Sequence, residues 1–188
     1  MKEGTLMHDI RTFGMPACED TPKKTILLSN DIQAAYTRLT QGLESTFHEH
    51  PRYTIRGNEF ATRHTTLRNS TVFYQPTDGT ALVPGVIRQI FSSSSNPDQV
   101  FLAIHRHLPA HWQLGDYDPF TAFPDFGAGI WSKETHDRVE VIPSTRRLYA
   151  TDLRTWDEDK CVMKPVIEVR AMTSAQLGSV LIQISQDF

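Results

Sequence analysis

The stretch that decides the fold is Val83-Pro-Gly-Val-Ile-Arg-Gln-Ile-Phe91, which a serine-rich loop separates from Val100-Phe-Leu-Ala-Ile-His-Arg-His107. Both runs are rich in β-branched and aromatic residues, which is typical of strands. Because side chains alternate along a strand, the second run divides into two faces: Val100, Leu102 and Ile104 on one, and Phe101, Ala103, His105 and His107 on the other. Pro84-Gly85 predicts a bulge or an edge position in the first run. The two runs therefore predict a bent pair of strands.

Further short strands are predicted on both sides of this pair. The runs lie at residues 53–56, 71–75, 139–142, 147–150 and 161–163, and turn-forming residues separate most of them. Residues 108–131 are rich in Pro, Gly, Asp and aromatics, and we expect them to wrap over the sheet as a packed loop. The tail beyond residue 165 has no pattern that settles its type.

A helix is predicted before the first strand, from about Asp31 to His48. Ser29-Asn30-Asp31 supplies residues that cap helices, and Pro51 follows the far end. The apolar positions repeat every three or four residues, as on one face of a helix: Ile32, Ala35, Tyr36, Leu39, Leu43 and Phe47.

Together these elements predict a mainly β, α+β fold with an N-terminal helix, curled into a small sheet or a partly open β-barrel. We divide the chain into an irregular leader (1–23), a helical segment packing on the domain (24–50), the β domain (51–165) and a C-terminal extension (166–188). The length of 188 residues suits this single domain.

The composition narrows the class of protein. A formal charge of −3 disfavours a generally cationic nucleic-acid binder, although a local basic patch is compatible with it. The two cysteines, Cys18 and Cys161, are far apart and form no paired metal-binding motif. The N-terminus has no secretory pattern and no apolar run is long enough to span a membrane. We expect an intracellular protein with no membrane partner.

Four of these segments, in this order, resemble a bromo-adjacent homology domain: Ser70-Thr-Val-Phe-Tyr74, 83–91, 100–107, and Val139-Glu-Val-Ile-Pro143 with the strand after it. More closely, residues 63–165 resemble the C-terminal region of En/Spm-type transposase-associated proteins of mushroom-forming fungi. The similar stretches include Leu67-Arg-Asn-Ser70, Asp118-Pro-Phe120, Phe123-Pro-Asp-Phe-Gly127 and Val162-Met-Lys-Pro165.

The resemblance implies a non-enzymatic chromatin or protein-interaction module of transposon-associated origin. It would have no cofactor, a protein partner such as a histone or nucleosome, weak DNA binding at most, and a location that could be nuclear. Ile104-His105-Arg106-His107 stands where the family has an aromatic run, so no methyl-lysine cage is expected there. The catalytic part of a transposase is absent from the sequence.

The aromatic loop is the first candidate ligand site. It contains Trp112, Tyr117, Phe120 and Trp131, together with Asp116 and Asp118. Aromatics with a carboxylate can hold a methylated ammonium through cation–π attraction, and the same residues suit a peptide or sugar groove. The alternative is that these aromatics form the second half of a small core.

Arginines form a second candidate site, for phosphates or for acidic residues of a partner. Arg56, Arg63 and Arg68, with His64, lie in one region of the sequence, and Arg146 and Arg147 lie in another. Arginines at the ends of strands suit phosphate contacts. The alternative is a solvated face whose charges are paired with carboxylates.

Histidines give an alternative site, for a metal. His105 and His107 share one face of a strand and His111 follows, a spacing that could bind zinc or iron with a nearby carboxylate. They could equally be ordinary histidines at a strand end. The function classes left open are therefore an interaction module, a metal-dependent β-barrel enzyme, and an element-derived fragment with no selected activity.

Overall fold

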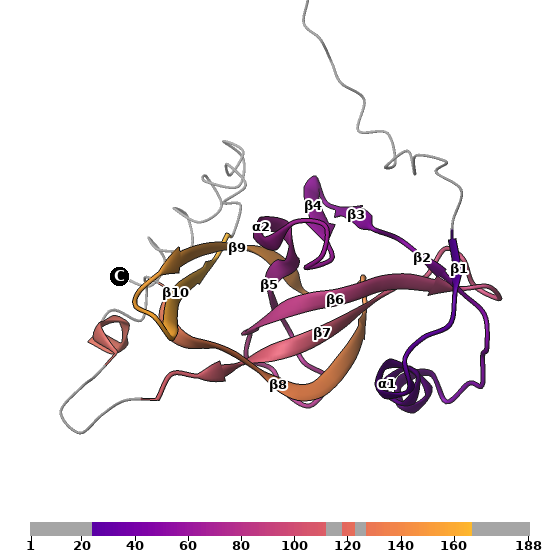
Figure 1. The fold of residues 1–188 in the computed structure, drawn as a ribbon, viewed down its shortest axis with the longest axis horizontal. Helices are drawn as coiled ribbons and strands as arrows, with labels where there is room; N and C mark the ends of the chain where they lie inside the picture. Colours follow the sequence, from indigo (N-terminus) through magenta and orange to yellow (C-terminus); the bar gives the residue numbers. More distant parts are fainter. Residues whose placement is uncertain (1–23, 112–117, 123–126, 167–188) are drawn as a thin grey trace, which may run out of the picture.

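The computed structural model describes residues 24–111, 118–122 and 127–166 (Figure 1). Two α-helices and one 3-10 helix lie among ten strands in these ranges. In chain order they are β1 (Lys24–Ile26), α1 (Asn30–Thr40), β2 (Phe47–Glu49), β3 (Arg52–Ile55), β4 (Asn58–Ala61), α2 (Leu67–Ser70), β5 (Thr71–Tyr74), β6 (Val83–Ser93), β7 (Val100–Pro109), η1 (Pro119–Ala122), β8 (Gly129–Pro143), β9 (Leu148–Thr155) and β10 (Lys160–Pro165).

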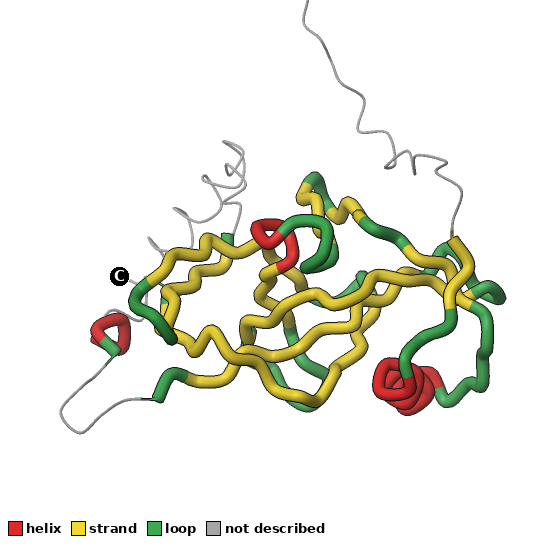
Figure 2. The backbone as a smooth tube through the Cα atoms, viewed as in Figure 1, coloured by secondary structure: helices red, strands yellow, loops and turns green. Residues whose placement is uncertain are grey.

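Six of the strands close into an antiparallel barrel. They pair in the order β6-β5-β9-β10-β8-β7, and β7 pairs back with β6 to complete the ring (Figures 1 and 2). Strands β1 and β2 extend the sheet from β6, whereas β3 and β4 form a separate hairpin. The predicted mainly β fold with an N-terminal helix is thus confirmed, and the pairing of β6 with β7 leaves the barrel closed. A closed barrel has no exposed edge within its ring.

The β6–β7 hairpin is the bent pair that the sequence predicts, but its bulge lies elsewhere. The register shifts between Ile87 and Gln89, which leaves Arg88 without a partner in the ladder. Pro84 and Gly85 pair regularly with β5. A side chain at Gly85 would come within 2.5 Å of the Ile104 methyl group and 2.9 Å of the His105 carbonyl oxygen. The glycine therefore permits a close approach of strands, and the bulge bends the hairpin.

The barrel has an apolar interior. From β7 it takes Val100, Leu102 and Ile104, the face that alternation predicts, and it packs them against residues of β4, β5, β6, β8 and β9. The largest contributors besides these are Phe60, Val72, Tyr74, Ile87, Ile90 and Ile142, all almost fully buried. Burial is the main cause that raises the pKa of the Tyr74 phenol far above its usual range, and the charge of Glu140 acts in the same direction.

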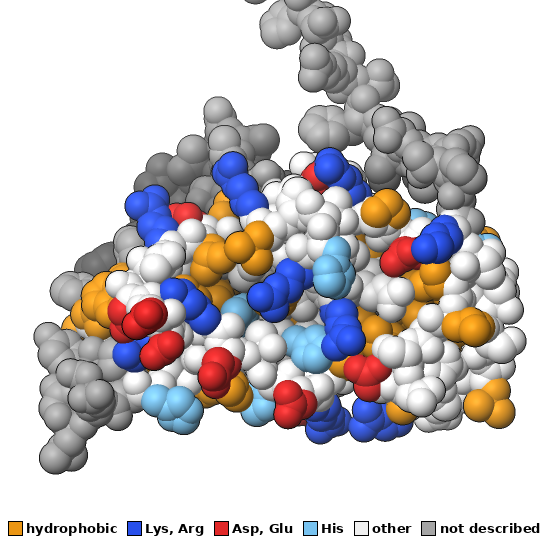
Figure 3. Space-filling view, in the orientation of Figure 1, with side chains coloured by type: hydrophobic (Ala, Val, Ile, Leu, Met, Phe, Trp, Pro, Cys, Tyr) orange, Lys and Arg blue, Asp and Glu red, His pale blue; other side chains and the backbone are white. Residues whose placement is uncertain are grey.

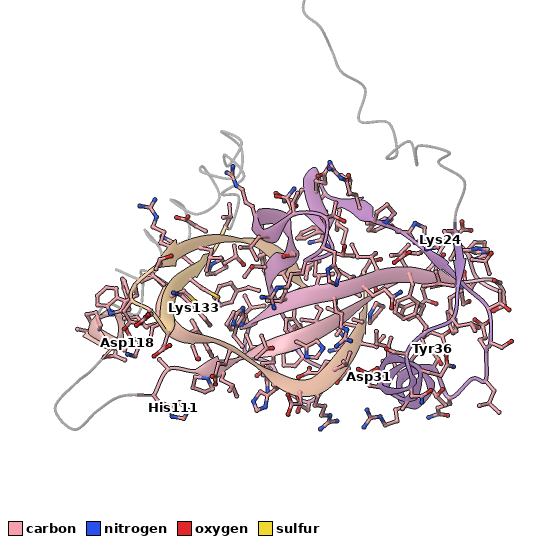
Figure 4. All side chains as sticks on the ribbon, viewed as in Figure 1. Lys24, Asp31, Tyr36, His111, Asp118 and Lys133 are labelled. Atoms are coloured by element: carbon pink, nitrogen blue, oxygen red, sulfur yellow. The ribbon has the colours of Figure 1, made fainter. Side chains whose placement is uncertain are left out.

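The opposite face of β6, β7 and β8 carries a second core at one end, which α1 covers. Tyr36 of α1 (labelled in Figure 4) makes edge-to-face contacts with Phe47, Phe91 and Phe101, at centroid distances of 5.2, 5.8 and 5.1 Å. Ala103, Val139 and Val141 complete the floor of this cluster. Edge-to-face aromatic pairs add to the stabilisation that burial of their area supplies.

The predicted helix is too long. It ends at Thr40, because Gln41 adopts a left-handed conformation with φ 56° and its N–H caps the carbonyl of Thr37. Leu43, predicted on the apolar face, is 93% exposed. Phe47, also predicted there, lies in β2 and pairs with Ser93. The apolar spacing continues past the end of the helix because Phe47, a buried residue of β2, happens to match the helical repeat.

Several strands extend or add to the predicted set. β8 begins at Gly129 rather than at residue 139, so part of the expected loop is strand. β1, β2 and β4 were not predicted, and β1 and β2 make the segment 24–50 part of the sheet as well as its helical cover. Residues 167–188 of the C-terminal extension lie outside the described residues. Among the helices described, none is long and apolar enough to cross a membrane.

Candidate functional site

A depression lies on the outer face of β6, β7 and β8, beside the end that α1 covers. Its volume is about 380 Å³, and it is lined by Arg63, His64, Val86, Arg88, His105 and Thr135. Figure 3 shows basic (blue) and histidine (pale blue) side chains near one another at the centre of this face. The lining therefore combines two guanidinium groups and two imidazoles with a small apolar patch.

Four segments bring these side chains together: the turn before α2, β6, β7 and, with Thr135, β8. Val86 faces His105 across the β6–β7 ladder, and the bulge that follows it leaves Arg88 exposed. Arg63 comes from the turn before α2, and its backbone N–H donates to the Ile87 carbonyl at 3.0 Å. This hydrogen bond fixes the turn against β6. The positions of Arg63 and Arg88 are thus set by backbone contacts, whereas their side chains are exposed to solvent.

His105 is held by two hydrogen bonds that define its protonation. Its Nδ1 lies 2.7 Å from the His136 carbonyl oxygen, which can only accept, and its Nε2 lies 3.1 Å from an Arg88 nitrogen, which can only donate. The ring must therefore carry its proton on Nδ1 and offer a lone pair at Nε2. In this arrangement Arg88 is held on the imidazole ring of His105 without neutralisation of the guanidinium charge.

Among the described residues, neither Arg63 nor Arg88 forms an ion pair with a carboxylate. The ion pairs there are Arg52–Glu59, Arg106–Glu140, Arg154–Asp152 and Lys160–Asp157. Asp31, at the start of α1, interacts with Arg88 through its charge. A hydrogen bond from Ser29 is the main cause that lowers the pKa of this carboxyl, and Arg88 contributes least.

His107 lies buried further along the same strand. Its Nδ1 is 3.0 Å from the Ser132 carbonyl oxygen, and its Nε2 is buried with no hydrogen-bond partner among the described residues. Burial is the main cause that lowers the pKa of His107, and the charge of Arg63 acts in the same direction. The imidazole is therefore held neutral, with its Nδ1–H donating to Ser132.

The histidines predicted for a metal site can be followed in the structure only with the described residues, since Asp116, a possible further ligand, lies outside them. In the part of the chain that the structure describes, no group of three or more His, Cys, Asp or Glu residues could hold a metal ion. The Nδ1 atoms of His105 and His107 face different carbonyl groups, and His111 is exposed beyond the end of β7 (Figure 4). The register shifts between His105 and His107 and beyond His107 change how β7 meets β8, so the regular spacing in sequence is not kept in space.

The predicted aromatic loop is only partly described. Trp112, Asp116 and Tyr117 lie outside the described residues. Asp118 (Figure 4) holds the loop together, since one carboxylate oxygen accepts from the Phe120 N–H at 2.8 Å and the other from the Ile130 N–H at 3.2 Å. Phe120 is half-buried.

Trp131 packs against a third apolar cluster, around Phe73, Cys161 and Met163. Of the described residues of this loop, Trp131 is therefore arranged as the core alternative predicts.

The predicted arginines are spread over several elements. Arg63 lines the depression. Arg56 occupies the turn between β3 and β4 with φ 51°, next to Gly57 at φ 84°, as tight hairpins require. Arg68 is exposed on α2, and Arg147 is exposed before β9. Arg146 donates to the Pro76 carbonyl at 3.0 Å and so fastens the β5–β6 loop.

Sequence reasoning missed Arg88, which the structure places in the depression. The signal was present, because Arg88 is the one charged residue in an otherwise apolar or uncharged run from Val83 to Phe91. A charge in such a run marks a place where the strand turns a side chain out to solvent. In the structure, a β-bulge at this residue turns the Arg88 side chain out of the regular strand pairing.

Comparison of the chain with known proteins found no match. No protein family matches the chain, and no similar protein was found among the curated proteins or among the solved structures.

Proposed function

We propose that this chain is a non-enzymatic interaction module that binds an acidic segment of a chromatin or other protein partner in the cationic depression. The observation that carries the proposal is the pair of exposed arginines, Arg63 and Arg88, set in one hollow by separate segments and left without carboxylate partners among the described residues. Arginine forks are the side chains best suited to bind carboxylates or phosphates in pairs of hydrogen bonds.

The surroundings of the depression favour a compact acidic segment over a length of nucleic acid. The whole chain carries a formal charge of −3, and the volume of about 380 Å³ matches a few side chains. Duplex binding usually needs a run of basic contacts along the phosphate backbone. The likeness of the β strands to bromo-adjacent homology domains, and of residues 63–165 to transposase-associated fungal proteins, makes the nucleosome the first partner to test.

The test is a titration of purified protein against mononucleosomes and against the same naked DNA at matched salt. We expect nucleosomes to bind and DNA to bind much more weakly. Arg88→Ala should weaken nucleosome binding about tenfold or more, because a charge-assisted contact is lost. Arg154→Ala is the matched control, since Arg154 is an exposed arginine on β9 that does not line the depression.

Two outcomes contradict the proposal. Equal binding to both substrates, falling steeply with salt, would mean general phosphate attraction by surface arginines. Absence of binding to either would leave the chain without a chromatin partner and favour the reading of an element-derived fragment.

A further inference from the structure

The depression holds more positive charge than one carboxylate can balance. Arg63 and Arg88 each carry a full charge, and His64 and His105 can each take a proton. A single Asp or Glu of a partner would offset one guanidinium and leave the other unpaired. A phosphate monoester carries nearly two negative charges near neutral pH and has three acceptor oxygens, enough for two arginine forks and one further donor.

His105 stands where that further donor is needed. In the unbound protein its Nε2 lone pair accepts from Arg88 at 3.1 Å, while its Nδ1–H donates to the His136 carbonyl at 2.7 Å. A ligand that draws Arg88 to its own oxygens leaves this lone pair facing an anion, which is unfavourable. A proton on Nε2 removes the conflict, because the Nδ1–H bond is kept and Nε2–H then donates to the ligand.

Charged and polar groups from several elements surround His105. Arg88 on β6 and Arg63 and His64 from the turn before α2 line the same hollow, and His136 on β8 presents its carbonyl oxygen. Asp31 of α1 is a carboxylate whose charge interacts with that of Arg88. A bound dianion adds negative charge beside His105, so ligand and proton favour each other.

Resting on the proposed function, we infer that the depression recognises a phosphorylated side chain of a protein partner, held by Arg63 and Arg88 and by His105 after it takes up a proton at Nε2. A phosphodiester backbone fits less well, because each of its phosphates carries one charge and its length would extend beyond the hollow.

The probe is a peptide library with a fixed central phosphoserine and degenerate flanks, compared with the same library carrying serine or glutamate. Binding is measured by fluorescence polarisation, with a duplex oligonucleotide as a fourth ligand. We expect the phosphoserine library to bind about tenfold or more tightly than the glutamate library, and the serine library to bind least. Arg63→Ala and Arg88→Ala should each remove this preference, and Arg154→Ala should keep it.

Proton uptake tests the role of His105. The tightest phosphopeptide from the library is titrated calorimetrically at about pH 7.5, where its phosphate is already a dianion (second pKa about 6), in two buffers of different ionisation enthalpy. The measured binding enthalpy should differ between the two buffers for the wild-type protein, because the buffer supplies the proton that the complex takes up. His105→Gln should abolish the uptake, and His64→Gln should leave it in place.

The outcomes separate this inference from the proposed function. Equal binding of phosphoserine and serine libraries, with nucleosome binding still dependent on Arg88, would overturn the phosphate inference alone. Nucleosome binding that is unchanged in Arg88→Ala would overturn both the phosphate inference and the proposed function. Tighter binding of the duplex than of any peptide would assign the hollow to nucleic acid. Uptake that persists in His105→Gln would remove His105 as the proton acceptor. Thermal unfolding of each variant is the control that tests whether a loss of binding comes from a loss of folding.

Discussion

The outer face of β6, β7 and β8 has two ends that differ in almost every respect. At one end Phe91, Phe101 and Val141 lie under α1 and are almost fully buried. At the other end the same strands present Arg88 and His105 to an open depression. The same strands run through both ends, but β6 bulges at Arg88 and β7 shifts its register against β8 after His105. Side-chain type and these local irregularities together decide which end becomes core and which stays open.

The difference shows how one face of a barrel can serve stability and recognition at once. Aromatic residues at the covered end supply a large apolar area for α1 to bury. Charged groups at the open end would lose hydration without compensation if an apolar helix covered them. We therefore expect substitutions at the covered end to change the free energy of unfolding, and substitutions at the open end to change binding.

The largest expected effect comes from Phe101→Ala at the covered end. Phe101 is 2% exposed and contacts the rings of both Tyr36 and Phe91. Its removal should lower the free energy of unfolding by about 3–5 kcal/mol, since it leaves a cavity among rigid neighbours. His105→Ala, on the same strand at the open end, should lower it by about 1 kcal/mol. Urea denaturation of both variants measures the difference, and equal losses would break the contrast between the two ends.

Gly85→Ala tests the close strand approach beside the depression. The added methyl group would meet the His105 carbonyl oxygen at 2.9 Å, a backbone atom that cannot rotate away. We expect a loss of about 1–3 kcal/mol, the usual range for overpacking. Gly42→Ala is the control, because its nearest neighbour would be the Thr40 hydroxyl at 3.7 Å, an ordinary contact. If chemical denaturation gives the two variants the same stability, the strands at Gly85 are not as close as described.

The buried His107 predicts a pH dependence of stability. Its pKa is lowered in the folded protein from an ordinary value of 6.5, mainly by burial. Between that value and the lower folded pKa, the unfolded chain binds a proton that the folded chain does not. Stability from this group is therefore full above about pH 6.5 and falls as the pH drops, by up to about 1.4 kcal/mol per pH unit.

Denaturation curves from about pH 7.5 to about pH 5.5 should show this fall in the wild-type protein. His107→Asn should flatten the dependence, because the titrating ring is gone. His111→Asn should leave it as in the wild type, since His111 is exposed. A wild-type slope that survives in His107→Asn would assign the dependence to other groups.

The smallest expected effect on stability comes from Arg88→Ala. Arg88 is exposed and its guanidinium contacts the His105 ring. Its loss should change the free energy of unfolding by about 0.5 kcal/mol at most, as for most surface substitutions. Thermal unfolding is a sufficient measurement. A loss above about 2 kcal/mol would show that Arg88 supports the fold. Weaker binding by Arg88→Ala could then no longer be assigned to a lost contact with the partner.

The sequence predicts well what depends on local periodicity. The alternation along residues 100–107 places Val100, Leu102 and Ile104 inside and Phe101 and Ala103 outside, as the structure has them. The length of α1 was wrong, because pairing of Phe47 with Ser93 in the sheet outweighs helical spacing. Non-local contacts of this kind leave no trace in the local pattern.

The candidate site was less predictable for the same reason. Arg63 was singled out, but the depression needs Arg88 and His105 beside it, and these meet only because β6 bulges and the turn at Arg63 bonds to Ile87. The histidine spacing suggested a metal site on the assumption that side chains alternate regularly along the strand. Register shifts next to His107 break that regularity.

Two valines report which end of the face binds a partner. Val86 lies on the floor of the depression and Val141 lies under α1, and both are buried on the same face. Methyl NMR spectra of valine-labelled protein, recorded with increasing amounts of unlabelled nucleosome, follow both at once. We predict that the Val86 methyl signals shift or broaden while those of Val141 stay in place. Changes at Val141 with none at Val86 would contradict the assignment of the depression as the binding surface.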